Sequence, residues 1–107
     1  MISRFDETKN ALSAIIRAAF AKAAADGVLP DCAPADFVVE VPGDTAKGDF
    51  ATNAAMVNAR AMRAAPQKIA AALMERFDFG TLPVERCEAA GPGFINFFLK
   101  PDWFASL

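Results

Sequence analysis

The chain has 107 residues, of which 54% are apolar and 22% charged, so it can build one small core and is too short for two. It contains no histidine, which excludes a histidine-based catalytic triad, metal ligand or pH switch within these residues. Eleven basic side chains stand against 13 acidic ones, a net charge of -2, and this is not the charge of a protein held on nucleic acid by electrostatics alone.

The first predicted element is an amphipathic helix over residues 3–25. Its apolar residues, among them Leu12, recur at intervals of three, four and seven, which is typical of one buried helix face. Ser3 or Asp6 can cap its start, and the Asp26-Gly27 pair ends it.

A loop and a strand are predicted next. Two prolines interrupt residues 28–35 and favour a loop. Apolar residues alternate over 36–41, which predicts a strand, and Pro42 indicates that this strand lies at a sheet edge.

Two helices are predicted in the middle of the chain. Residues 50–65 are alanine-rich and free of proline, and we expect Asp49 to cap this helix. Pro66 suits the first position of a third helix over residues 66–77.

The remaining pattern completes an α+β domain. Residues 84–89 and 93–99 predict two antiparallel strands, and residues 101–105 resemble the first turn of another helix. The order α-β-α-α-β-β, followed by that helix start, predicts helices packed on one face of a small antiparallel sheet. Because the helix start is incomplete and leaves Trp103 exposed, we expect a fragment of a longer chain.

We expect residues 1–107 to form a single cytoplasmic domain. The N-terminus lacks the apolar core of a signal peptide, and no apolar run approaches the ~18 residues of a membrane span. Cys32 and Cys87 stand far apart with no imidazole to join them, so a zinc site is excluded and two buried free thiols are expected.

No catalytic residue is predicted. Residues 43–49, GDTAKGD, superficially resemble a phosphate loop, yet they fit neither GxxxxGK[ST] nor GxGxxG, and their two aspartates would repel phosphate. We interpret them as a capped turn. The acidic pairs have no catalytic partner, and the hydroxyls have no histidine to activate them.

The last predicted strand carries the candidate binding residues. Alternation puts Phe94 and Asn96 on one face and Ile95, Phe97 and Leu99 on the other. Since helices cover one face only, the aliphatic set belongs inside and the first pair on a solvated face. An aromatic ring beside an amide can stack on an unpaired base and read its edge. From spacing alone, the alternative is a ring that covers the sheet and an amide at a strand edge.

Two segments resemble a known family. GDFATNAA at 48–55 and AGPGFINFFL at 90–99, in this order over almost the whole chain, closely resemble the N-terminal additional domain of bacterial arginyl-tRNA synthetases. The resemblance implies a domain without chemistry of its own that precedes a class I catalytic domain and contacts the D-loop at the elbow of tRNA(Arg). The catalytic signatures HIGH and KMSKS are absent, so ATP and magnesium would belong to the missing portion, with no cofactor in this fragment.

The resemblance also implies RNA-binding residues. Phe94 would pack on a D-loop nucleotide and Asn96 would hydrogen-bond it, while Gly91 and Gly93 would let the backbone approach the RNA. Some relatives carry tyrosine where this chain has Phe94, so any contact through a phenolic hydroxyl is lost here.

The GDFATNAA motif is interpreted as structural: Asp49 caps, Phe50 packs, and Asn53 ties the loop to the first helical turn. The alternative is direct RNA contact by Asn53 or Lys47.

Two functions follow from the sequence. The first is a tRNA-contact module, monomeric, with no membrane or DNA partner, in which basic residues add weak attraction to phosphates: Arg60, Arg63, Lys68 and Arg76. The alternative is an inter-domain scaffold or protein-interaction module whose RNA contact is incidental. A third hypothesis, a self-contained enzyme, would require arginine turnover by this chain alone.

Overall fold

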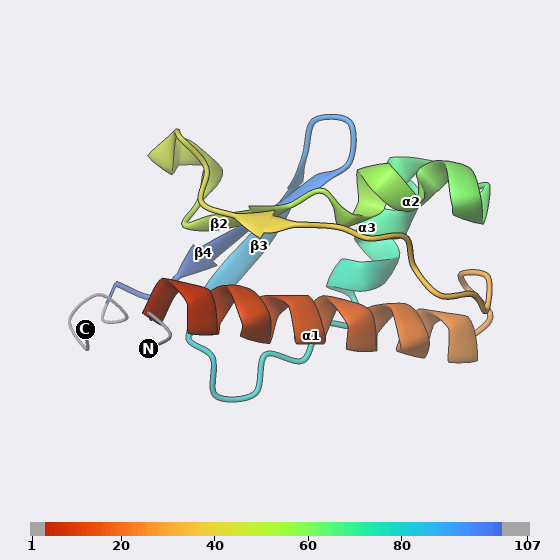
Figure 1. The fold of residues 1–107 in the computed structure, drawn as a ribbon, viewed down its shortest axis with the longest axis horizontal. Coiled ribbons are helices and arrows are strands. Elements are labelled where there is room, and N and C mark those ends of the chain that lie inside the picture. Colours follow the sequence, from red (N-terminus) through yellow and green to blue (C-terminus); the bar gives the residue numbers. More distant parts are fainter. Residues whose placement is uncertain (1–3, 102–107) are drawn as a thin grey trace.

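The computed structural model describes residues 4–101, and within them it contains three α-helices and one four-stranded sheet (Figure 1). The predicted α+β class is confirmed. The elements in chain order are α1 (Arg4–Ala25), β1 (Val39–Glu40), a 3-10 turn (Thr45–Lys47), β2 (Phe50–Thr52), α2 (Ala54–Met62), α3 (Pro66–Met74), β3 (Val84–Ala90) and β4 (Phe94–Leu99).

The sheet has the order β1-β2-β4-β3, and every neighbouring pair is antiparallel. Figure 1 shows α1 running along one side of the sheet, with α2 and α3 gathered at one end of the strands. Ile95, Phe97 and Leu99 of β4 belong to the same buried cluster as apolar residues from all three helices, so the predicted inward set is confirmed. The strand predicted near Pro42 is β1, and it lies at the sheet edge as expected.

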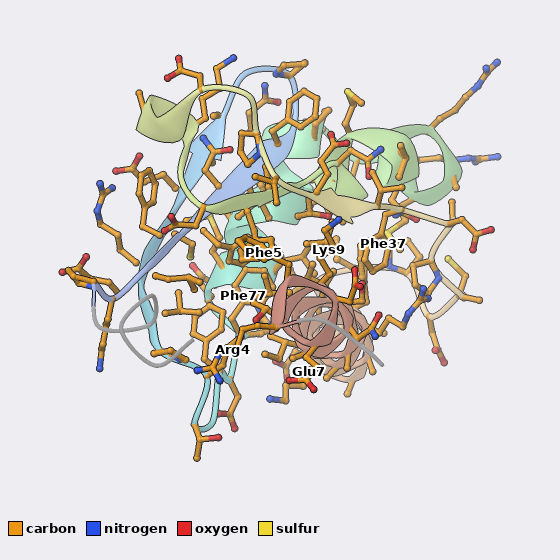
Figure 2. The ribbon with its side chains drawn as sticks, turned by 60° about the vertical axis from the view of Figure 1, so that its left-hand side comes forward. Arg4, Phe5, Glu7, Lys9, Phe37 and Phe77 are labelled. Atoms are coloured by element: carbon orange, nitrogen blue, oxygen red, sulfur yellow. The ribbon has the colours of Figure 1, made fainter. Side chains whose placement is uncertain are left out.

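Helix α1 buries the face that the periodicity predicts, including Leu12 and Ile16. Figure 2 looks along this helix and shows Phe5 on the side toward the sheet, with its ring 6.1 Å from that of Phe50, and Glu7 on the side away from it. The helix ends where Gly27 turns to φ +74 and the Val28 N–H donates to the Ala23 carbonyl over 2.9 Å. A glycine in this conformation is the common way to close a helix, so the predicted end is confirmed. Ser3 lies outside the described residues.

The helix predicted from residue 50 is wrong over its first turn, because Phe50–Thr52 forms the strand β2. Asp49 does not cap a helix. Its backbone N–H donates to the Phe97 carbonyl over 2.9 Å, and its Oδ2 accepts from the Leu99 N–H over 2.8 Å. Asp49 therefore forms its hydrogen bonds with β4 and not with the first turn of a helix.

The other boundaries differ by a few residues. Helix α2 ends at Met62 because Arg63 adopts the left-handed conformation, with φ 51 and ψ 44, and α3 ends at Met74 rather than residue 77. The helix start predicted for 101–105 lies almost wholly outside the described residues. No helix among residues 4–101 is long and apolar enough to span a membrane.

Hydrogen bonds from side chains replace part of the backbone strand pairing predicted for residues 36–41. The Thr52 hydroxyl donates to the Val38 carbonyl over 2.8 Å, and the Val38 N–H donates to Asn53 Oδ1 over 2.9 Å. Strand β1 therefore shrinks to two residues, yet the segment before it remains fixed to the end of β2.

Asn58 is a structural residue that sequence reasoning missed. It is fully buried on α2, where its Oδ1 accepts from the Ala35 N–H over 2.7 Å and its Nδ2 donates to the Ala54 carbonyl over 2.8 Å. An amide can satisfy both a donor and an acceptor, so Asn58 fastens the loop before β1 to the helix.

The expectation of two buried thiols is wrong. Cys32 is exposed and Cys87 is half-buried on β3, and both are free. Burial, helped by the neighbouring Glu88 carboxylate, raises the pKa of the Cys87 thiol. Thiolate is the reactive form of cysteine, so Cys87 is the less reactive of the two on both grounds.

We expect iodoacetamide at pH 8 to alkylate Cys32 about tenfold faster than Cys87 in the folded protein. Peptide mass spectrometry over a time course measures the two rates. In concentrated guanidinium chloride the rates should converge, because the burial of Cys87 is lost. Equal rates in the folded protein would contradict the packing of β3.

Candidate nucleic-acid interface

The site is built on the face of the sheet opposite the core. In β4 the residues Phe94, Asn96 and Phe98 alternate with the buried set, as predicted. One part of the prediction needs correction: Asn96 is not solvated but only 7% exposed, whereas Phe94 is half-buried. Asn96 lies in a central strand, paired on one side with Ala51 of β2 and on the other with Glu88 of β3. Its side chain is therefore flanked by neighbours on both sides.

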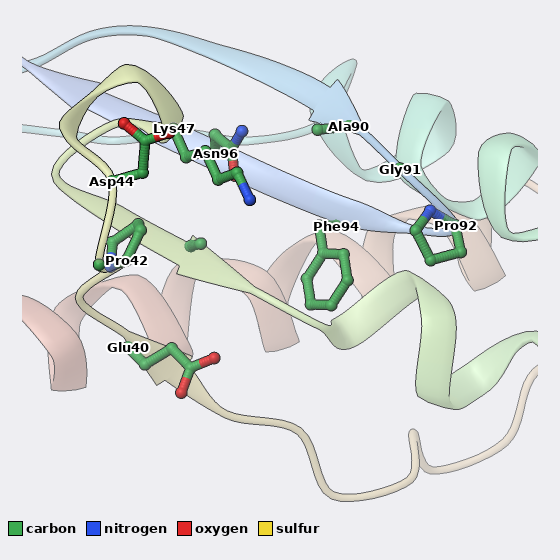
Figure 3. A pocket seen from close by; sticks show the side chains of 11 residues that line it. Glu40, Pro42, Asp44, Lys47, Ala90, Gly91, Pro92, Phe94 and Asn96 are labelled. Carbon is green, nitrogen blue, oxygen red and sulfur yellow. The ribbon is translucent and has the colours of Figure 1, made fainter.

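A hollow of about 700 Å³ opens beside these two residues (Figure 3). Register explains its floor, because Ala51 pairs with Asn96 on one side and with Glu40 on the other. A methyl group therefore stands between two longer side chains, and the space above it stays empty. The turn before β2 and the β3–β4 turn complete the wall, which includes Pro42, Gly43, Asp44, Lys47, Ala90, Gly91 and Pro92.

The Asn96 amide faces this hollow without a partner from the described chain. Within residues 4–101 its side chain makes no hydrogen bond, and none of its polar atoms is completely sealed from solvent. Because these atoms still reach solvent, water can satisfy them in the free protein, and a ligand that enters the hollow must replace that water. The amide lines the hollow with both a donor and an acceptor to offer.

The charges around the hollow disfavour an anion. Its wall carries the carboxylates of Glu40 and Asp44 against the single ammonium of Lys47. Asp44 is fixed in the turn, because its Oδ1 accepts from the Ala46 N–H over 2.9 Å. A phosphate would meet two carboxylates and one ammonium on this wall, whereas a neutral planar group would meet the Phe94 ring and the Asn96 amide.

The structure brings four of the six sequence-predicted site residues together. Phe94, Asn96, Gly91 and Lys47 all line the hollow. The other two, Gly93 and Asn53, do not.

Gly93 is buried against α2 and α3 instead. Its carbonyl accepts from the Met56 N–H over 3.1 Å, and a Cβ on Gly93 would stand 2.9 Å from the Met56 nitrogen and 2.7 Å from Pro66 Cβ. The missing side chain therefore allows two helices, rather than a ligand, to approach the strand.

Residues of GDFATNAA make structural contacts, but two of their predicted roles need correction: Asp49 pairs with β4 and caps no helix, and Asn53 does not tie the loop to the first turn of α2. Asn53 ties the chain to Val38 ahead of β1 and makes no side-chain capping bond to the first turn of α2. Gly48 is at φ +93, where a Cβ would come within 2.7 Å of the Phe97 carbonyl oxygen. Ala51 is the member of the motif that lines the hollow.

The four basic residues expected to assist do not line the hollow. Arg76 is bound elsewhere, with its Nε donating to Asp26 over 2.9 Å. A basic residue that sequence reasoning missed is Arg86 of β3, whose guanidinium lies 3.7 Å from the centre of the Phe98 ring and pairs with Glu88. Arg86 and Phe98 are paired across β3 and β4. The alternation within each strand does not reveal this contact, because it leaves the register between the two strands unknown.

The fold and the hollow together define a small α+β domain with one helix-covered sheet face and one open face, which carries an aromatic ring and an amide that has no side-chain hydrogen bond within residues 4–101. Residues 10–99 match the family model described as the arginyl tRNA synthetase N terminal domain. The chain belongs to this family, as the two sequence motifs implied.

Individual relatives agree. The chain is 42% identical over 98 residues to an arginine–tRNA ligase of Desulforamulus reducens and 43% identical over 97 residues to one of Moorella thermoacetica, matches that cover 92% and 91% of this chain. They cover 18% and 17% of those relatives, so the chain spans less than a fifth of their length.

Solved structures show the same fold. The Thermus thermophilus arginyl-tRNA synthetase superposes with a TM-score of 0.70 at 24% identity, over 92% of this chain and 15% of that one. The Plasmodium falciparum arginyl-tRNA synthetase gives 0.70 at 17% identity, over 92% and 17%.

ATP and magnesium do not fit the described residues. Among residues 4–101 no cluster of three or more His, Cys, Asp or Glu side chains is arranged to hold a metal ion. The described wall of the hollow sets two carboxylates, of Glu40 and Asp44, against the ammonium of Lys47, which disfavours a triphosphate.

Proposed function

We propose that this chain is the tRNA-contacting domain of an arginine–tRNA ligase and that it binds the D-loop at the elbow of tRNA(Arg) through Phe94 and Asn96. The observation that carries the proposal is the Asn96 amide, which is 7% exposed, lines the hollow and has no hydrogen-bond partner in residues 4–101.

The chemistry of the hollow favours an unpaired base. RNA is read by sequence mostly in loops, where bases can be splayed out, stacked on aromatic rings and hydrogen-bonded along their edges. Phe94 supplies the ring and Asn96 the edge contact. Because two carboxylates flank the hollow, the base enters it while the phosphates stay outside, and this domain adds orientation more than electrostatic affinity.

In the proposed whole protein, a class I domain elsewhere in the polypeptide holds ATP and magnesium and joins arginine to tRNA in the cytoplasm. The domain described here works as a monomer. With a net charge of -2 it binds tRNA more weakly than micromolar by itself, and the longer protein supplies the remaining contacts.

An NMR titration of the isotope-labelled chain with tRNA(Arg) at low salt tests the proposal. We expect the amides of residues 91–97 and the Asn96 side-chain amide to shift, and a tRNA with substituted D-loop bases to reduce those shifts several-fold. The backbone amides of α1, which packs on the core side of the sheet away from the hollow, serve as the internal control and should not shift.

Two results would count against the proposal. If no amide shifts at millimolar-range RNA, the inter-domain scaffold becomes the better description. A tight complex that is insensitive to salt would contradict weak binding through a single base.

A further inference from the structure

We infer that Ala51 sets the depth of the hollow and so determines that it takes one neutral, base-sized group. This inference rests on the proposed function. Ala51 belongs to the GDFATNAA motif, in which its neighbours make structural contacts. Its own role would be to position the ligand.

The register of the sheet carries the first step. Ala51 stands directly between Asn96 and Glu40 on neighbouring strands, where facing side chains on an antiparallel pair lie about 4.5–5.5 Å apart at Cβ. A valine or leucine side chain at this position would extend over the Asn96 amide, whereas serine adds one small polar atom. The amide would then meet carbon atoms in place of a ligand.

Composition supports the same step. Alanine is depleted in strands, and larger apolar residues stabilise a sheet better. Ala51 nevertheless occupies the middle of the three-residue strand β2, between Phe50 and Thr52, which both face the core side. A small residue here weakens the sheet slightly and leaves the hollow open.

Size and charge define the occupant. At about 700 Å³ the hollow falls within the range of about 300–1,000 Å³ typical of small-molecule sites, so it can hold one base with its sugar. The carboxylates of Glu40 and Asp44 outnumber the Lys47 ammonium on the described wall, so the hollow disfavours phosphate. The group admitted is therefore the neutral face of an unpaired nucleotide.

The test replaces Ala51 by leucine, by valine and by serine in the 107-residue chain and measures tRNA(Arg) binding by NMR titration and unfolding by circular dichroism. We expect Ala51→Leu to bind at least about tenfold more weakly while its melting temperature stays equal or rises. Ala51→Ser, which keeps the depth, should bind within about twofold of the original chain. Ala21→Leu makes the same change at an exposed site on α1 and should change nothing.

The outcomes separate the two proposals. Undiminished binding by Ala51→Leu overturns the inference and leaves the proposed function standing, whereas an original chain whose residues 91–97 do not respond to tRNA overturns the proposed function itself. If Ala51→Leu lowers the melting temperature, the binding of Ala51→Val tests the inference in its place. The valine side chain is smaller, suits a strand and still occupies the floor of the hollow.

Discussion

We expect Gly93→Ala to lower the free energy of unfolding by about 3–5 kcal/mol. Two penalties combine. Gly93 has φ +131, a conformation that side chains rarely adopt, and its Cβ would stand 2.9 Å from the Met56 backbone and 2.7 Å from Pro66. Backbone atoms and a proline ring cannot move aside easily, so the strand must separate from α2 and lose the bond between the Met56 N–H and the Gly93 carbonyl.

Urea denaturation followed by circular dichroism measures the loss. Gly91→Ala is the matched control two residues earlier, since Gly91 has φ +54 but its Cβ would meet only the Phe94 ring edge at 3.7 Å. We expect this variant to lose about 1–2 kcal/mol, the cost of the left-handed conformation alone. If both variants lost the same small amount, the close packing of Gly93 against the helices would be refuted.

We expect Asn96→Ala to weaken tRNA(Arg) binding by about 1–3 kcal/mol, or about 5- to 150-fold, with little change in stability. The amide makes no hydrogen bond within residues 4–101, so its removal breaks no bond in the described protein. A base that paired with it would lose its partner in a nearly buried place, where an unsatisfied group is costly.

Titration and urea denaturation of the same variant distinguish a binding role from a packing role. Asn10→Ala, an exposed asparagine on α1, is the control and should leave both measurements unchanged. A packing role for Asn96 would give the reverse pattern, with stability lost and tRNA binding kept in proportion to the folded fraction.

The sequence by itself determined the class of the fold and which residues of β4 face toward and away from the core. Helical spacing in α1 and the alternation of Phe94 to Leu99 reflect which side chains must leave water, and that information is local. Proline and glycine marked the start of α3 and the end of α1 because they restrict or relax the backbone regardless of what surrounds them.

Only the tertiary structure decided what the residues between those elements do. Phe50–Thr52 belongs to an alanine-rich segment whose composition favours a helix. It forms a strand because β4, some 45 residues away in sequence, supplies its hydrogen-bond partners. Pairing of β2 with both β1 and β4 sets Ala51 between Glu40 and Asn96. Tertiary packing also places Gly93 against Met56 of α2 and Pro66 of α3. The hollow therefore depends on register across three strands, and a register joins distant segments whose pairing no local pattern encodes.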